Sequence, residues 1–492
     1  MTKAKRYILF FLAALVFVIL FSMTTSFLYA YEGGDAALFK QMGLGVLKGK
    51  VLYRDLFDNK GPLLFLLHAL GLALGGNLAL LIMQAISLTA TFIIWDKILA
   101  LRCTERQRWI RMGLLVLLLL CFYYDGDLSE EWCLPWASWP ILAYLRAKDE
   151  KRSLDHKEMF LTGLCCGVIA FIRPNNAVPF VGFIVYDLIV RLTKKEVKGF
   201  FVSLLLLLAG LLVIALPIFI YFYAIAGWSG VDDMVYGAFL SNFEYMELPL
   251  HPKWYLKVTY IVIACSALVL QLLNSRKERD LLIPAILSYA LFYFSFGHRY
   301  TWHYLITLLP LFAVLMATFP PRSVTAEART LRTISMVLAI MAIPSCLHYM
   351  AKPVGLMIND VVLQRDPYKK IYADFHDCVE GIPEVERDSI CVYNVAALGS
   401  GAMQHEGLLR CNRRFAWIAQ NIERLNREEA AKGGIAPLWV MASFDMPYYY
   451  DDSLVFAEMY DLRYRFVADM TYLEKPIRLS RKKEILIYRR KE

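Results

Sequence analysis

Residues 31–62 read YEGGDAALFKQMGLGVLKGKVLYRDLFDNKGP and come directly after an apolar N-terminal segment. They contain Asp35, then a short amphipathic run, then a charged turn with Asp55, Asp58 and Lys60. If the N-terminal segment crosses a bilayer, these charges lie at the rim of the membrane, where removing a charge from water is costly and is usually tied to function. We therefore expect the chemistry of the protein in this stretch.

The composition around this stretch is that of a membrane protein. Of the 492 residues, 58% are hydrophobic, too many for an ordinary soluble enzyme. The apolar runs Tyr7–Leu28, Phe200–Ala224 and Tyr255–Leu273 are long enough to cross a hydrocarbon core, which takes roughly 20 helical residues. The predicted fold class is a polytopic α-helical membrane protein.

The net charge of +9 is spread over short basic clusters between apolar segments, one cluster in every second loop. This is the positive-inside pattern, so the charge indicates topology, and no nucleic-acid partner is expected. We expect a cytoplasmic N-terminus and an extracytoplasmic region after residue 350. The first apolar segment is longer than the core of a signal peptide, so we interpret it as an uncleaved helix.

Hydropathy and loop charge predict about eleven spans. They lie near 7–30, 77–100, 109–124, 130–147, 158–172, 175–193, 198–224, 257–274, 281–296, 302–319 and 330–349. Residues 62–75 are apolar but too short to cross, so we place them at the outer leaflet or in a re-entrant position. Pro174 removes a backbone donor and disfavours helix at Arg173, which predicts a break between two spans.

Residues 354–492 are charged and aromatic, and they predict a small extracytoplasmic α/β domain after a membrane domain of residues 1–353. Expected strands are 389–395, 438–443, 464–470 and 484–488, and expected helices are 366–380, 418–432 and 453–461. No nucleotide-binding, zinc or nucleophile-elbow motif occurs there. A Cys391–Cys411 disulfide would require an oxidising compartment, and spacing alone does not establish it.

Asp35 and Lys60 are the main candidates for function. A carboxylate at the water–lipid boundary fits a general base, and a lysine at the same height fits a contact to an anionic head group. Each residue also has a structural interpretation. Asp35 could cap a helix over 36–48, and Lys60 could extend its amine to the membrane surface.

Three further groups of polar residues lie at predicted external rims. Glu130 and Glu131, near Asp127, could bind a divalent cation or orient an acceptor, or they could simply begin a helix. Arg173, with Asn175 and Asn176, is too costly to face lipid and is expected to line a cavity. The run 297–304, which contains Arg299 and His303, could bind phosphate or stack on a sugar, or it could be an interfacial aromatic belt.

Together these residues resemble the GT-C superfamily of membrane glycosyltransferases, and most of all its bacterial branch related to protein O-mannosyltransferases and lipid A aminoarabinose transferases. The likeness covers roughly residues 1–350. It is carried by Asp35, Phe39, Gly43, Gly49, Tyr53, Asp55, Phe57, Asp58, Lys60 and Pro62, with Glu130-Glu131, Arg173-Pro174-Asn175 and His303-Tyr304 further along. Many members have an Asp-Glu pair at the first position, whereas Glu32 stands apart from Asp35 here.

This resemblance implies an inverting transfer of a sugar from a polyprenyl-phosphate donor, on the outer face of a bacterial cytoplasmic membrane. The acceptor would be a glycan, lipid or protein of the cell envelope. Asp35 would be the catalytic base. No particular cofactor is expected with certainty, and dependence on a divalent metal held by Asp35 and Glu130 stays an open alternative. Donor phosphate contacts are expected from Lys60, Arg173, Arg299 and His303, and the second carboxylate or acceptor contact from Glu130, Glu131 or Asp58. The alternatives are a non-enzymatic transporter or flippase of lipid-linked glycan, and an inactive glycan-binding scaffold.

Overall fold

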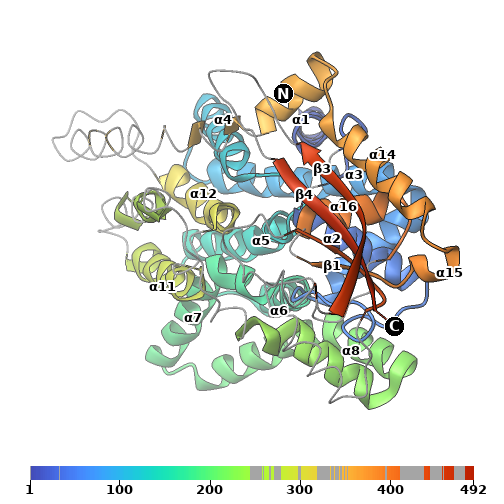
Figure 1. The fold of residues 1–492 in the computed structure, drawn as a ribbon. Coiled ribbons are helices and arrows are strands. Elements are labelled where there is room, and N and C mark those ends of the chain that lie inside the picture. The colour runs from blue at the N-terminus through green and yellow to red at the C-terminus, as the bar shows by residue number, and fades with distance from the viewer. Residues whose placement is uncertain are drawn as a thin grey trace.

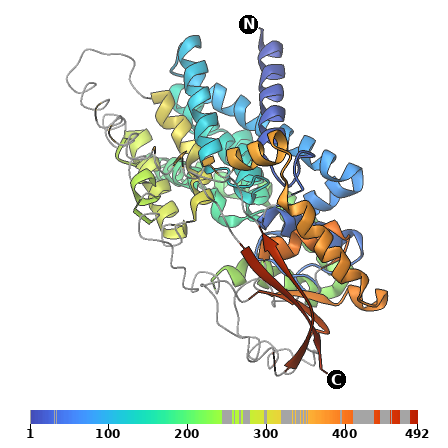
Figure 2. The same ribbon diagram turned by 45° about the horizontal axis from the view of Figure 1, so that its top comes forward.

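The computed structural model of the chain is mostly helical, with a small mixed sheet near the C-terminus (Figure 1). It describes residues 2–30, 32, 34–243, 257–258, 260–264, 268–270, 279–296, 301–318, 353–393, 396–409, 437–443, 460–469 and 482–491, together with isolated positions in 333–351 and at 457 and 459. The N-terminal end of α1 and the C-terminal strands lie at opposite ends of the molecule in Figure 2.

Most of the N-terminal region is built from helices whose limits follow capping and breaking residues. They are α1 Lys3–Phe21, α2 Gly34–Leu47, α3 Pro62–Ala100, α4 Glu105–Phe122, α5 Ser129–Asp149, α6 His156–Ala170, η1 Pro174–Ala177, α7 Val178–Thr193, α8 Val197–Val235, η2 Tyr236–Leu240, α11 Arg279–Phe296, η3 Trp302–Leu308 and α12 Leu309–Thr318. The Asp155 side chain, for example, accepts from the Glu158 amide at the start of α6, while the Glu158 side chain accepts from the Asp155 amide. This reciprocal cap satisfies two amides that would otherwise lack partners.

Four of the helices are long and apolar enough to cross a membrane, as far as the described residues go: Lys3–Phe21, Pro62–Ala100, Pro174–Thr193 and Val197–Phe243. They support a membrane protein, whereas a full set of about eleven spans is not shown. The predicted span 330–349 falls largely outside the described residues, and part of 257–274 does as well. The first span is shorter than predicted because α1 ends at Phe21, where the hydroxyl-rich stretch 22–26 begins.

Backbone breaks divide the long helices where the sequence predicts them. Gly75 and Gly76 have non-helical dihedral angles, so α3 consists of a short segment before them and a long one after them. This confirms that residues 62–75 are separate from the following span. Pro174 begins η1 directly after α6, which confirms the predicted break at Arg173.

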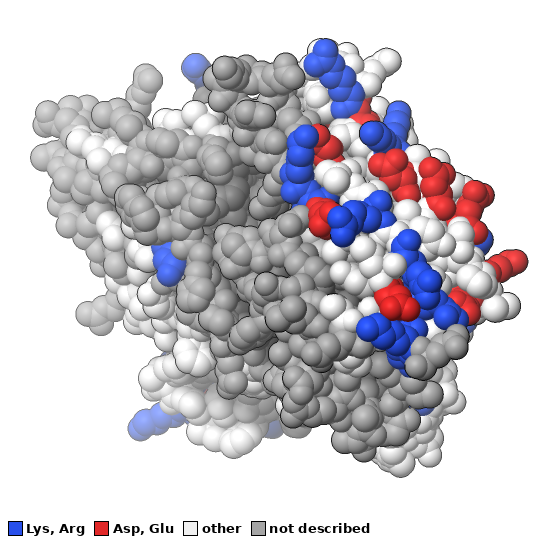
Figure 3. Space-filling view, viewed as in Figure 1, with Lys and Arg blue, Asp and Glu red and all other residues white. Residues whose placement is uncertain are grey.

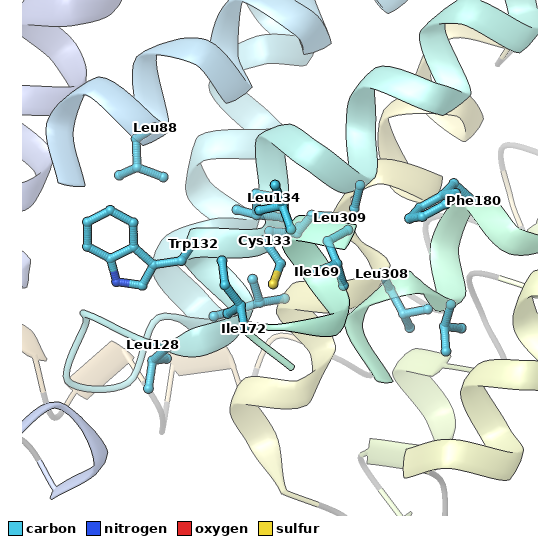
Figure 4. Close-up of a cluster of buried hydrophobic side chains, with 14 of the residues drawn as sticks. Leu88, Leu128, Trp132, Cys133, Leu134, Ile169, Ile172, Phe180, Leu308 and Leu309 are labelled. Carbon is cyan, nitrogen blue, oxygen red and sulfur yellow. The ribbon is translucent and has the colours of Figure 1, made fainter. Parts of the chain in front are cut away.

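The core of the membrane domain forms where α3, α5, α6, α7, η3 and α12 meet. Figure 4 shows the convergence of Leu88, Leu128, Trp132, Cys133, Leu134, Ile169, Ile172, Phe180, Leu308 and Leu309, all of which are buried. Helices α6 and α8 approach closely at glycines. A Cβ on Gly163 would lie 2.1 Å from the carbonyl oxygen of Leu207, so this contact requires a residue without a side chain.

The C-terminal region forms a four-stranded sheet in the order β1-β2-β4-β3. Its elements are η4 Met357–Val362, α14 Pro367–Glu380, α15 Glu384–Arg387, β1 Ile390–Tyr393, α16 Ala396–His405, β2 Trp439–Ala442, β3 Tyr460–Asp469 and β4 Lys482–Arg490. Strands β1 and β2 are parallel, and the other two pairs are antiparallel. The four predicted strands and the helix at 366–380 are confirmed. The helix predicted at 418–432 lies outside the described residues, as does most of 453–461, whose last two residues belong to β3.

The surface of the C-terminal region carries mixed charge. Figure 3 shows acidic and basic side chains interspersed over this part of the face. Pairs across β3 and β4 include Arg465–Glu484 at 3.3 Å and Lys482–Asp469 at 2.9 Å. A surface with both signs of charge interspersed is typical of a domain in water, in contrast to the apolar exterior of the long helices.

The C-terminal region packs directly on α2 through α16 (Figure 1), and the start of α14 bonds to the residues just before α2. The Asp366 carboxylate accepts from the Ala30 amide at 2.9 Å, and the Tyr372 hydroxyl accepts from the Glu32 amide at 3.3 Å. On α2, the Gln41 side chain donates to the Leu408 carbonyl at 3.0 Å. The segment that contains Asp35 is therefore held between the membrane domain and the C-terminal region.

Candidate functional site

Lys60 lies in a turn whose backbone is fixed against the end of α6. The Gly61 amide donates to the Ile172 carbonyl at 2.8 Å, and the Leu63 amide donates to the Phe171 carbonyl at 2.9 Å. A Cβ on Gly61 would lie 2.2 Å from the carbonyl oxygen of Phe171. The turn therefore needs glycine at this position, and its backbone contact brings Lys60 next to the break that follows α6.

Tyr53 supports the same turn from the other side. Its backbone has a φ of 68°, an uncommon conformation for a bulky residue, which costs about 1–3 kcal/mol and is often found at functional sites. Its hydroxyl donates to the Lys60 carbonyl at 2.7 Å, and its amide bonds to the Leu56 carbonyl. The loop before α3 is thus held in one shape by contacts at both of its ends.

The amine of Lys60 lies between two carboxylates. Its Nζ is 3.8 Å from Asp35 Oδ2 and 3.3 Å from Asp58 Oδ1, and it sits 5.3 Å from the centre of the Phe39 ring. Asp58 is fully buried and Lys60 is nearly so, whereas the Asp35 side chain is 38% exposed. Asp35 is therefore the accessible member of the group, in the first turn of α2, where the helix dipole favours a negative charge.

The charges around Asp35 keep it ionised. Burial acts to raise the pKa of Asp35, but the positive charges of Lys60, His303 and Arg173 outweigh it, so the pKa lies below its usual value. Burial likewise acts to lower the pKa of Lys60, but Asp35 and Asp58 reverse this, and the pKa of the amine is raised. Both groups are charged at neutral pH.

Arg173 reaches the site from the break between α6 and η1. Its guanidinium donates to Glu130 Oε1 at 2.5 Å and to the Ser129 hydroxyl at 3.3 Å. It also stacks over the Tyr304 ring at 4.6 Å. Glu130 is fully buried, so its charge requires this partner, and the pair joins α5, the break and η3.

His303 comes from η3, far along the chain, and completes the described part of the cluster. Its ring lies 4.9 Å from that of Tyr304 and 6.0 Å from that of Tyr124. Burial lowers the pKa of His303 although the carboxylates of Glu130 and Asp35 act to raise it, so the ring is mostly neutral at neutral pH. The aromatic rings beside it offer flat surfaces of the kind on which a sugar can stack. Arg299, the remaining predicted phosphate contact, lies outside the described residues.

Glu131 is separated from its neighbour Glu130 because adjacent helical residues point in different directions. Glu131 accepts from the Gln84 amide at 2.8 Å, from the Tyr123 hydroxyl at 3.0 Å and from the Asp127 backbone amide at 3.1 Å. Glu131 is thus a member of a buried network between α3 and α5. Of the three acids proposed as the second carboxylate or acceptor contact, Glu130 pairs with Arg173, Asp58 pairs with Lys60, and Glu131 belongs to this separate network.

Two buried pairs of polar side chains beside the site were not predicted from the sequence. Lys40 Nζ bonds to both carboxylate oxygens of Glu32, at 2.8 and 2.9 Å, and to the Thr24 carbonyl at 2.6 Å. His68 Nε2 lies 3.1 Å from Asp127 Oδ2, and its Nδ1 lies 2.8 Å from the Leu64 carbonyl. The sequence signal for both pairs was polar residues inside apolar, helical stretches.

The partners of His68 orient its ring. A carbonyl only accepts, so Nδ1 of His68 carries a proton, and Nε2 faces the Asp127 carboxylate. Burial acts to raise the pKa of Asp127, but His68 outweighs it and the pKa is lowered. The Phe39 ring lies between this pair and Lys60, 5.6 Å from the His68 ring.

A metal site is not evident among the described residues, where no three His, Cys, Asp or Glu side chains gather suitably to hold an ion. Asp35 and Glu130, the two metal ligands considered from the sequence, each face a cation instead. What the cluster offers chemically is one accessible carboxylate beside cations that can hold an anion, with aromatic rings at its edge. Of the sequence candidates, it unites Asp35, Asp58, Lys60, Glu130, Arg173 and His303.

Comparison with known proteins corrects the family assignment. A family model described as the competence-induced protein Ccs4 N-terminal domain matches residues 1–333. No glycosyltransferase family model matches, so the resemblance to the GT-C superfamily was wrong as an assignment of family. No curated protein matches the chain. The matched residues include Asp35, Lys60, Glu130, Arg173 and His303.

Proposed function

We propose that this chain, which belongs to the family of the competence-induced protein Ccs4 N-terminal domain, is an integral membrane glycosyltransferase that takes a sugar from a polyprenyl-phosphate donor. The family description names no reaction, so the proposal rests on the site. The observation that carries it is the contact of the accessible Asp35 with the buried Lys60, beside Arg173 and His303. The acceptor would be a glycan, lipid or protein of the cell envelope.

The proposed topology is a multi-pass protein of about eleven spans in a bacterial cytoplasmic membrane. Its N-terminus is cytoplasmic, and its C-terminal region shares the outer side with Asp35. The loop charges of the sequence support this orientation. It is also supported by the packing of α16 on α2, which requires both to lie on one side.

In the proposed reaction, the acceptor hydroxyl attacks the anomeric carbon of the donor from the face opposite the phosphate. Asp35 takes the hydroxyl proton, a new glycosidic bond forms, and the bond to the phosphate oxygen breaks with its electron pair leaving on the phosphate. A phosphate leaves as a stable anion without needing a strong acid. Lys60 stabilises the charge that builds on it, and Arg173 adds positive potential.

Donor binding would also change the pKa of Asp35 and so its strength as a base. Lys60 holds the pKa of Asp35 low in the empty site, and a low pKa makes a weak base. A phosphate beside Lys60 would compensate part of its positive charge and so raise the pKa of Asp35 toward a range more useful for proton transfer. The carboxylate would then be strongest as a base when the donor is in place.

The test is an in vivo analysis of lipid-linked sugars. Cells whose only copy carries Asp35→Asn should accumulate the same polyprenyl-phosphate sugar in lipid extracts as cells that lack the protein. The matched control is Asp232→Asn, an exposed acid outside the cluster, which should leave the extract as in the wild type. Wild-type extracts from the Asp35→Asn strain, with the variant present in the membrane at normal amounts, would contradict the assignment of the base.

A transporter or flippase of lipid-linked glycan is the second candidate, favoured by the helix breaks at Gly75-Gly76 and at Arg173-Pro174. Broken helices beside a charged site are common in transporters. Solvent-accessibility labelling of Asp35→Cys separates the two functions. Access from the outer side alone supports transfer, whereas access from each side in turn supports transport.

A further inference from the structure

The helical backbone of α8 is interrupted at Gly227, whose φ is +63°. Before this break the helix is one of the long apolar segments, and its exposed side chains, such as Leu205 and Ile220, are apolar along its length. After the break the chain continues as a helical segment over residues 228–243, through η2, at one end of that apolar helix.

One side of the helical segment 228–243 is buried against the loop that contains Lys60. The buried positions recur every three or four residues and are Gly230, Val231, Met234, Gly237, Ala238 and Ser241. A Cβ on Gly237 would lie 2.1 Å from the Tyr53 ring, so the helix and the loop touch without space between them. Arg54 bonds to Asp233 at 3.0 Å and to Ser229 at 2.7 Å.

The contact extends to the turn that contains Lys60. Asn59 Nδ2 donates to Asn242 Oδ1 at 2.9 Å, and Asn242 Nδ2 donates back to the Asn59 carbonyl at 3.0 Å. Asn59 is the residue between Asp58 and Lys60. The position of Lys60 is therefore tied to the position of residues 228–243.

The opposite side of this segment presents large apolar side chains. Trp228 is 72% exposed, Phe243 is 67% exposed and Leu240 is half exposed. The Trp228 ring packs against that of Tyr223, 5.2 Å away across the break. Tryptophan and tyrosine concentrate at the level of lipid head groups, where an apolar ring with a polar group is most stable. Asp232 is exposed on the same segment, and a carboxylate of this kind is excluded from the acyl core.

We propose that residues 228–243 form a membrane-surface helix whose partner is the head-group region of the bilayer. The segment continues directly from an apolar helix, so its exposed side chains extend a surface that already faces lipid. The water–lipid boundary is the one environment that is favourable both for its aromatic side chains and for its exposed acid. Through Asn59 and Tyr53, this helix sets the turn of Lys60 at head-group depth. The proposal does not rest on the proposed enzyme activity.

The experiment measures the depth of single positions in the full-length protein reconstituted in phosphatidylcholine nanodiscs. A fluorescent amino acid is placed at Phe243 or at Trp228, both of which are exposed, so neither change disturbs the packed side. The lipids carry bromine, a quencher, either near the head-group end or near the methyl end of their acyl chains. Ile220 in the apolar part of α8 serves as the control within the membrane, and Val385, 94% exposed in the C-terminal region, as the control in water.

The expected result is a loss of fluorescence at Phe243 and Trp228 that is larger with the shallow bromine than with the deep one. Ile220 should respond to the deep bromine, and Val385 to neither. Absence of quenching at Phe243 and Trp228, while Ile220 is quenched, would overturn the proposal and assign this face to water or to a protein partner. Stronger quenching by the deep bromine at both positions would overturn it as well, since the segment would then lie in the acyl core.

Discussion

At the scale of single residues, the charged side chains of the site differ in their exposure to solvent. Asp35 is open to a ligand, while Lys60, Asp58 and Glu130 are buried and hold one another in place with Arg173. The buried groups fix the direction of the electric field, and the Asp35 carboxylate is the one that the proposed acceptor would reach. Burial of the cations also makes their effect on Asp35 stronger than it would be in water.

The charge of Lys60 should control the pH dependence of transfer. Lys60 is the largest of the effects that lower the pKa of Asp35, so replacing it with methionine raises that pKa. Because a base must be ionised to act, the acidic limb of the kcat/KM profile should move to higher pH in Lys60→Met, in addition to a loss of donor affinity. Kinetics over a pH series, with polyprenyl-phosphate sugar from the accumulating strain, measure both. If the acidic limb does not move although the donor binds more weakly, Lys60 does not control the pKa of Asp35.

Individual site residues could be predicted from the sequence, whereas most of their contacts could not. Asp35 and Lys60 could be singled out because charges at the edge of an apolar segment are costly. The partners were harder to find: Lys40 and His68 stand in apolar, helical stretches, where a polar side chain has no visible partner in the sequence. Their acids, Glu32 and Asp127, come from loops eight and 59 residues away. Only the fold brings each pair together.

At the scale of elements, the turn between α2 and α3 depends on close backbone contact at Gly61. Gly61→Ala places a Cβ 2.2 Å from the Phe171 carbonyl oxygen, so the backbone must move, at a cost of about 1–3 kcal/mol. Because Lys60 precedes this glycine, we expect a lower kcat/KM as well as lower stability. Gly113→Ala is the matched control, since a Cβ there meets nothing within 4 Å. Transfer assays and thermal unfolding of both variants measure the effects. Equal activity of the two variants would show that the contact does not position Lys60.

The docking of α2 depends on the buried Lys40–Glu32 pair. Lys40→Met leaves the Glu32 carboxylate largely buried without its cation, and breaking such a pair costs about 3–5 kcal/mol. Burial already raises the pKa of Glu32 even with Lys40 present. We expect a large fall in the unfolding temperature in detergent for Lys40→Met, and a partial recovery in Lys40→Met/Glu32→Gln, which removes both charges. A double variant less stable than the single one would show that the ion pair is not the source of the loss.

At the scale of the whole molecule, the long helices and the sheet could be predicted, but the contact between them could not. Hydropathy and the break at Pro174 predict the helices, and β-branched, alternating runs predict the strands. The docking of the C-terminal region on α2 joins residues such as Gln41 and Leu408, whose separation in the chain leaves no local signal. This contact covers one side of the segment that holds Asp35, so it would shape the site in the proposed function.

The docked arrangement also makes a prediction about sidedness. Because α16 packs on α2, the C-terminal region and Asp35 must lie on the same side of the membrane. The break at Arg173 is on that side as well, since Arg173 contacts Glu130 in the cluster. Helix α7 has 16 residues and so extends about 24 Å beyond η1, and we expect it to carry the basic loop with Lys195 to the opposite side.

Labelling of intact cells with a membrane-impermeant thiol reagent tests this arrangement. Val385→Cys should react in intact cells, because the side chain is exposed in the C-terminal region, whereas Lys195→Cys should react only after the cells are permeabilised. The parent protein provides the background from native cysteines. The reverse pattern would place the proposed site on the cytoplasmic side and contradict the orientation deduced from the loop charges. Reaction of both positions in intact cells would show that they share a side, which would contradict α7 as a membrane-crossing helix.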